Sequence, residues 1–209
     1  MKKVMIALAS MGLSTAAMAG PSWTFVDLGY AESSSSEELA GTEDISGYDI
    51  TGSFGFAGIW HINGTYGTIT TESVGSPDVD VDRYRIGAGA HPAITDSTDF
   101  VAEIGYTAWE VDAGGGSDPE PEAIDLTLGV RSMVTDQFEL NAFLATQIGS
   151  SDFGSSDDDF TNLAPSVGGQ YFFTDNISVN VNYTWNDVQS LAVGSLTGDT
   201  ARFGVRWSF

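Results

Sequence analysis

Hydrophobic and polar residues alternate along most of the chain with a period of two. In the last segment, ARFGVRWSF at 201–209, apolar side chains occupy the odd positions, and arginine, glycine and serine occupy the even ones. Because successive side chains of a β-strand point to opposite faces, this alternation predicts a strand with one apolar and one polar face. The apolar face lies either against a protein core, with the arginines in water, or against lipid, with the arginines in a lumen.

A strand–turn–strand unit recurs along the chain at intervals of about 40 residues. Residues 87–106, 129–145 and 168–184 each contain an alternating run, a Thr-Asp pair and a second alternating run. Residues 52–66 form a fourth such unit, which turns at about 57–59. Asp and Asn stabilise tight turns by bonding to their own backbone, so each unit predicts a β-hairpin.

Four hairpins and one lone alternating run at each end of the chain predict ten strands. Nearly all are long enough to cross a bilayer, which takes about nine to eleven residues, whereas strands of soluble proteins average about five or six. The predicted strands cover residues 22–32, 47–57, 60–73, 78–91, 98–111, 122–133, 137–149, 161–173, 176–188 and 199–209. We therefore expect an all-β, up-and-down, antiparallel transmembrane barrel of ten strands, with eight strands as the alternative.

The first 19 residues have the features of a secretory signal peptide. Lys2 and Lys3 precede a short apolar run, which ends in small residues up to Ala19. The run is short for a membrane-spanning helix, so cleavage after Ala19 is favoured over a retained anchor. We expect residues 1–19 to be removed and residues 20–209 to form one outer-membrane barrel domain.

Composition excludes several classes of function. The chain has no cysteine, which rules out disulfides and thiolate sites. Loss of Lys2 and Lys3 changes the formal charge from −22 to −24, with five arginines against 29 acids. Such a surface repels phosphate backbones, so we expect no nucleic-acid partner. No pattern indicates a cofactor.

The strand charges share one face. All five arginines and five strand acids fall on the parity opposite to the apolar residues, which balances the charge of that face. In a narrow closed interior, unpaired charges are costly, and pairing relieves the cost. The alternative is the wet face of a soluble sheet. The predicted lumen network consists of Asp27, Asp49, Arg83, Arg85, Glu103, Asp125, Arg131, Glu139, Arg202 and Arg206.

The hairpin registers suggest which of these charges pair. A three-residue turn at 134–136 sets Arg131 directly across from Glu139, and an equivalent turn at 94–96 places Glu103 diagonal to Arg85, within reach of long side chains. Closure of the first strand onto the last brings Asp27 near Arg202 or Arg206. On this hypothesis the terminal arginines cross-link neighbouring strands inside the barrel.

Three stretches carry a family resemblance. The phrases MVTDQFELNAFL and FFTDNISVNVNYTW and the terminal Phe209 resemble small outer-membrane proteins of the OmpA-like barrel superfamily. The resemblance implies that the C-terminal aromatic residues Phe203, Trp207 and Phe209 form the signal read by the barrel-assembly machinery. The best-known relatives have eight strands, which is why eight is kept as the alternative.

Short and long connections alternate between the strands. The short turns of the repeated hairpins contrast with longer segments rich in Gly, Ser, Asp and Glu, such as residues 112–122. In outer-membrane barrels the short turns are periplasmic and the long loops extracellular. We therefore expect both termini in the periplasm of a Gram-negative bacterium, and outer-membrane lipid and lipopolysaccharide as partners.

The two histidines are the main candidates for chemistry. His61 and His91 are predicted on the inward parity at the periplasmic ends of neighbouring strands, where they lie side by side. The pair could form a two-histidine metal site or a contact that responds to protonation. The alternative is that the two side chains only pack as polar groups at the periplasmic end of the lumen. Outer-membrane enzymes of this class carry their catalytic groups at the extracellular rim. Both histidines are predicted at the opposite end of the barrel, beyond hydrogen-bond reach of that rim, so we expect the protein not to be an enzyme.

Acidic clusters in the loops are candidates for divalent cations, because Ca²⁺ and Mg²⁺ prefer oxygen ligands. No loop has the full twelve-residue calcium pattern, and a solvated acidic surface is the alternative, including one adapted to salt. The candidates are Asp78, Asp80, Asp82, Asp157, Asp158 and Asp159.

A small barrel has an interior that its own side chains fill. The sequence therefore favours a structural or surface-interaction protein that displays acidic loops, with a narrow channel for ions or small solutes as the alternative. It names no ligand and no oligomeric state.

Overall fold

The computed structural model describes residues 21–35, 42–73, 79–112, 120–153, 156–190 and 196–209. All regular structure in this part of the chain is β-strand. The strands are β1 (Phe25–Ser35), β2 (Thr42–Phe56), β3 (Trp60–Ser73), β4 (Val79–Ala90), β5 (Ala93–Thr95), β6 (Thr98–Asp112), β7 (Glu122–Thr135), β8 (Phe138–Phe153), β9 (Ser156–Phe172), β10 (Ile177–Ser190) and β11 (Leu196–Ser208).

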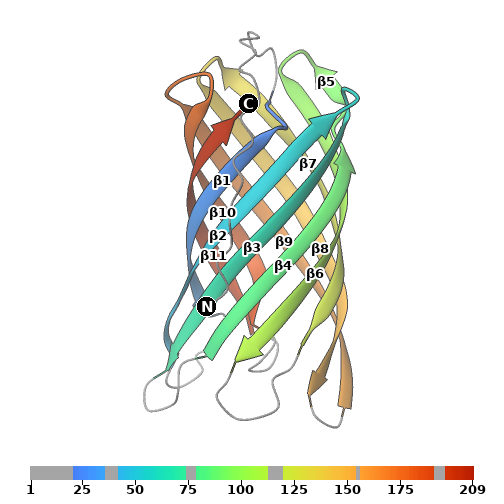
Figure 1. The fold of residues 1–209 in the computed structure, drawn as a ribbon, viewed down its shortest axis with the longest axis vertical. Helices are drawn as coiled ribbons and strands as arrows, with labels where there is room; N and C mark the ends of the chain where they lie inside the picture. The colour runs from blue at the N-terminus through green and yellow to red at the C-terminus, as the bar shows by residue number, and fades with distance from the viewer. Residues whose placement is uncertain (1–20, 36–41, 74–78, 113–119, 154–155, 191–195) are drawn as a thin grey trace, which may run out of the picture.

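Ten long strands close into an antiparallel barrel (Figure 1). Each long strand pairs with the next long strand along the chain, including β4 with β6, and β1 pairs with β11 to complete the ring. The three-residue strand β5 belongs to the connection between β4 and β6. The predicted ten-stranded fold is confirmed, and the eight-stranded alternative is wrong.

The two ends of the barrel differ, and we name them by their connections. At the turn end, which is uppermost in Figure 1, tight turns follow β2, β5, β7 and β9, and the chain ends there at Phe209. At the loop end, the strands are joined through stretches outside the described residues. The first turn has three residues between the paired Phe56 and Trp60, and two of them, Ala57 and Gly58, have φ angles of 50° and 80° in the left-handed region.

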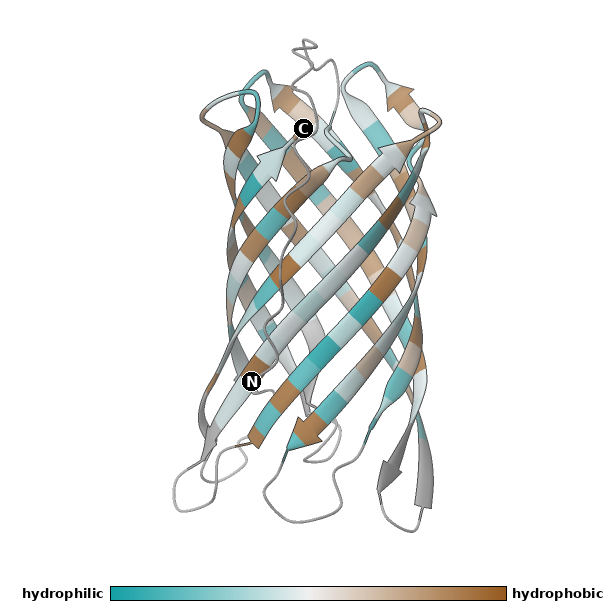
Figure 2. Ribbon diagram, in the orientation of Figure 1, coloured by the Kyte–Doolittle hydropathy of each residue, from teal (hydrophilic) through white to brown (hydrophobic). Residues whose placement is uncertain are grey.

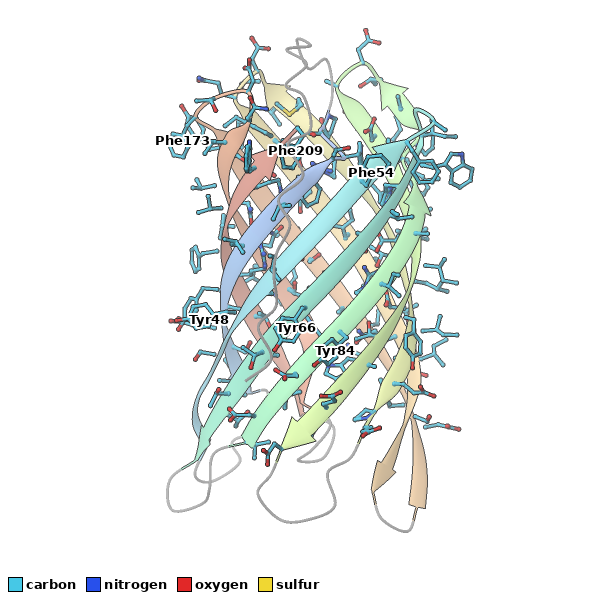
Figure 3. All side chains as sticks on the ribbon, viewed as in Figure 1. Tyr48, Phe54, Tyr66, Tyr84, Phe173 and Phe209 are labelled. Carbon is cyan, nitrogen blue, oxygen red and sulfur yellow. The ribbon has the colours of Figure 1, made fainter. Side chains whose placement is uncertain are left out.

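Apolar side chains cover the outer wall of the barrel. Leu28, Ile86 and Ile104 are each more than half exposed, and brown and teal residues alternate along single strands in Figure 2. Tyr48, Tyr66 and Tyr84 lie toward the loop end, whereas Phe173 and Phe209 lie toward the turn end (Figure 3). This arrangement matches an apolar band between aromatic girdles. No helix in the described part of the chain could cross a membrane.

Candidate functional site in the barrel lumen

Arg85 on β4 holds together one cluster of charged residues in the lumen. Its guanidinium bonds Glu103 on β6 and Asp125 on β7, with 3.1 Å between Nε and Asp125 Oδ1. Nη1 donates to Asn63 Oδ1 on β3 at 2.7 Å, and Thr107 donates to Asp125 at 3.1 Å. One arginine therefore links four strands, which the fork of five guanidinium donors makes possible.

Arg202 on β11 forms the second cluster. Its Nε donates to Asp49 Oδ2 at 2.8 Å, and Nη2 donates to Asp27 Oδ1 at 2.5 Å. Asp27 is almost fully buried, and its other oxygen accepts from Arg206 at 2.9 Å and from Asn180 at 2.7 Å. These bonds connect β1, β2, β10 and β11 around the closure of the barrel. A buried carboxylate shared by two arginines is well compensated.

Arg131 and Glu139 form a third pair on the hairpin of β7 and β8. Nε and Nη2 of Arg131 donate to the two oxygens of Glu139, both at 2.8 Å. Glu139 is fully buried and Arg131 is 5% exposed. This bidentate arrangement, with two parallel hydrogen bonds, is the strongest geometry for an arginine–carboxylate pair.

The registers behind two of these pairs differ from the prediction. Met133, not Arg131, faces Glu139, because the β7–β8 turn is shorter than three residues and carries a register shift after Met133. Gly89, not Gly87, faces Glu103. The arginines still reach their carboxylates diagonally because their side chains are long.

Arg83 stands apart from the predicted network. It lies on the lumenal face of β4 between Gly67 and Trp109, and its Nε is buried with no hydrogen-bond partner among the described residues. Asp99 on β6, which the prediction omitted, is buried on the lumenal side and bonds Trp23. Asp99 adds a strand acid to the five that the prediction placed in the lumen, so the predicted balance of five arginines against five acids is wrong.

An apolar cluster fills part of the lumen toward the loop end. Val81, Trp109, Val111 and Ala123 are at most 3% exposed, and partly buried side chains pack against them. Sequence reasoning missed this cluster, although Val81 shares the parity of the lumenal arginines on β4 and Val111 that of Glu103 on β6. The partly buried neighbours are Ile69, Val79 and Phe160.

Trp23 occupies the turn end of the lumen. Its ring stacks on His61 and on His91, with centroids 4.6 and 4.2 Å away, and Nε1 donates to Asp99 at 2.8 Å. Arg131 lies 4.4 Å above the same ring. The sequence prediction placed Trp23 in the first strand and gave it no role, although its parity matches that of lumenal Asp27.

The two histidines lie side by side, with ring centroids 5.4 Å apart. His61 Nε2 lies 2.9 Å from Glu103 Oε2, and His91 Nδ1 lies 3.8 Å from Asp99. Burial, together with the adjacent His61, lowers the pKa of His91. The described residues contain no group of three or more potential metal ligands. The arrangement is a packed aromatic and polar cluster.

A cavity of about 240 Å³ separates the Arg85 and Arg202 clusters. Trp23 lines it at the turn end, and Thr127 on β7 lines its side. Amide side chains provide much of the remaining wall: Asn63, Asn141, Gln170, Asn180 and Asn182. This small volume leaves room for water among the polar side chains and is not that of a wide pore.

The other candidate residues lie outside the lumen or outside the described part of the chain. Phe203, Trp207 and Phe209 are 55%, 44% and 41% exposed on the outer wall of β11 and just after it. Asp80 and Asp82 accept bonds from Thr70 and Tyr66. Asp159 is exposed, Asp78 lies outside the described residues, and so do the side chains of Asp157 and Asp158.

Comparison with known proteins identifies the family. The model of the outer membrane protein beta-barrel domain matches residues 5–209. The chain belongs to this family. Family and fold together place this barrel in the outer membrane of a Gram-negative bacterium and agree with the resemblance to OmpA-like barrels.

Solved structures share the fold of this outer-membrane barrel at low sequence identity. The COG4313 outer membrane channel from Pseudomonas putida F1 has a TM-score of 0.57 and 10% identity, covering 95% of this chain and 100% of that chain. The NanC porin has a TM-score of 0.54 and 14% identity, covering 88% and 100%. Ail of Yersinia pestis scores 0.44 at 14% identity, covering 90% and 99%. Among curated proteins, none matches this sequence.

Proposed function

We propose that this barrel acts through its surface and its extracellular loops, as a structural or surface-interaction protein, and that its lumen does not conduct. The occupied lumen is the observation that supports this function. The Arg85 and Arg202 clusters each join four strands, Trp23 occupies the turn end, and the Trp109 cluster packs toward the loop end. Between them a cavity of about 240 Å³ remains.

The orientation in the membrane is part of this proposal. Barrels of this kind place short turns in the periplasm and longer loops outside the cell. The turn end then faces the periplasm with both termini, and the loop end faces outward. Near the loop end, tyrosines on the outer wall donate to carboxylates, as Tyr183 does to Asp199 at 2.8 Å and Tyr30 does to Glu32 at 3.0 Å.

Outer-membrane lipid and lipopolysaccharide are the partners of this outer wall. Tyrosine rings prefer the boundary between hydrocarbon and headgroups, where the ring is apolar and the hydroxyl is wet. The hydroxyl–carboxylate pairs therefore fall at the height of the headgroups of the outer leaflet. Assembly of the barrel involves the barrel-assembly machinery, for which the outward aromatic residues after Arg202 are the recognition element.

Conductance of the purified protein in planar bilayers tests the closed lumen. We expect no steady single-channel current across the voltage range in which a small porin, measured in the same lipid, conducts. Steady current through the unmodified protein would contradict the proposal and favour a narrow channel for ions or small solutes.

A further inference from the structure

Residues 21–24 cross the opening at the turn end. β1 begins at Phe25 and pairs only with β2 and β11. Trp23, two residues earlier, bonds Asp99 on β6 and contacts Arg131 on β7. In the ring of ten long strands, β6 and β7 lie on the side of the barrel opposite to β1. The side chain of Trp23 therefore reaches from the β1 side of the barrel to residues of the opposite wall.

The backbone of this segment is fixed at several points. Arg131 Nη1 donates to the carbonyl of Ser22 at 3.1 Å, and Ser53 Oγ donates to the carbonyl of Trp23 at 2.9 Å. Phe209 N–H donates to the carbonyl of Thr24 at 3.0 Å. Gly55 permits the close approach, because a Cβ at that position would lie 3.0 Å from Trp23 Cβ. These bonds hold the indole in one place.

The residues around the indole form a socket for a planar aromatic ring that carries an N–H donor. His61 and His91 supply stacking surfaces, Asp99 accepts the N–H bond, and Arg131 lies over the ring. Stacking and cation–π contacts of this kind favour an aromatic ring at this position. In this protein the indole of Trp23 occupies the socket.

We propose that residues 21–24 are a stopper, with Trp23 as its plug, that closes the lumen cavity at the turn end. Trp23 is part of the cavity lining, so removal of the indole joins the cavity to the solvent at that end. The barrel wall does not depend on the plug, because the β1 pairings begin at Phe25. The stopper therefore controls access to the lumen without being part of the wall.

The absence of cysteine from the chain permits a direct test by thiol accessibility. Thr127→Cys places one thiol in the cavity wall, and its reaction with a small charged thiol reagent is followed in detergent micelles. In the Trp23→Gly background we expect the rate to rise about tenfold or more, as access no longer requires a local opening. Free indole at millimolar concentration should slow the reaction again by refilling the socket.

Two further variants separate the plug from general loosening. Thr95→Cys, at the exposed end of β5, should react at the same rate with and without Trp23. Trp23→Leu keeps an apolar side chain at this position but loses the ring and its N–H, and it should raise the rate at Thr127→Cys even if Trp23→Gly fails to fold. Equal rates at Thr127→Cys with and without these changes, in protein that migrates as folded before boiling, would overturn the stopper.

Discussion

Glu139 shows how the lumen tolerates buried charge. Its carboxylate is fully buried, and both oxygens accept bonds from Arg131. A carboxylate without a partner in such surroundings would cost several kcal/mol, whereas a bidentate arginine compensates most of that cost. Arg131 also bonds the carbonyl of Ser22, so the pair connects the β7–β8 hairpin to the stopper.

Replacing Glu139 by Gln should destabilise the barrel. The amide has nearly the same shape but leaves the Arg131 charge without its counter-ion, and breaking a buried pair typically costs about 3–5 kcal/mol. We expect a lower urea midpoint for unfolding from lipid vesicles, followed by tryptophan fluorescence. Asp136→Asn, on an exposed turn, is the matched control and should leave the midpoint unchanged. An unchanged midpoint for Glu139→Gln would mean that the pair adds nothing to stability.

Parity along the strands was enough to suggest which charges share the lumen. It could not fix the register, because turn length shifts the partners by whole residues: Met133, not Arg131, faces Glu139. It also gave no reason to expect that Arg83 Nε would be buried with no hydrogen-bond partner among the described residues. Trp23 was missed because its contacts on β6 and β7 are far away in sequence and depend on closure of the barrel.

Strand β11 closes the barrel and carries two sets of side chains with different roles. Arg202 and Arg206 point inward to Asp27, whereas Phe203, Trp207 and the following Phe209 lie on the outer wall. The ring of Phe209 contacts that of Trp207, with centroids 4.9 Å apart. About half of each outward side chain is exposed on the outer wall, so we expect its contribution to folding stability to be small.

Phe209→Ala should therefore impair assembly in the cell more than stability. We expect several-fold less folded protein in the outer membrane, measured by the unboiled band on a gel, but unchanged refolding into detergent. Phe173→Ala removes another exposed phenylalanine from the outer wall at the same end and serves as the control (Figure 3). Equal losses for both variants would show that Phe209 is not a specific recognition element.

The hairpin repeat predicted the number of long strands correctly, but it did not predict how far the strands extend toward the loop end. β9 begins at Ser156 and β2 at Thr42, each five residues before the predicted start. These stretches are rich in Ser, Asp, Glu and Thr, of which Asp and, to a lesser degree, Glu have low preference for strands. Backbone pairing carried over from the membrane-spanning part, such as that between β8 and β9, overrides this preference.

The whole molecule has a polar interior and an apolar exterior, the reverse of a soluble barrel. Leu28, Ile86 and Ile104 are more than half exposed on the outer wall, whereas Asp27 and Glu139 are buried in the lumen. An outer band of this size in water would drive association, because exposed apolar area of this extent is favourable only against lipid or another protein. Detergent or lipid therefore replaces the solvent on the outside of the folded state.

Solubility of residues 20–209 tests this arrangement for the whole molecule. We expect the purified chain to aggregate in buffer alone and to fold in detergent micelles, with a β-sheet circular dichroism spectrum. The unboiled sample should migrate faster on a gel than the boiled one, because a closed hydrogen-bonded ring has no free edge from which to unfold. A monomer that stays folded in water without detergent would mean that the apolar band faces a protein core, and the lumenal ion pairs would then have to be reassigned to a solvated face.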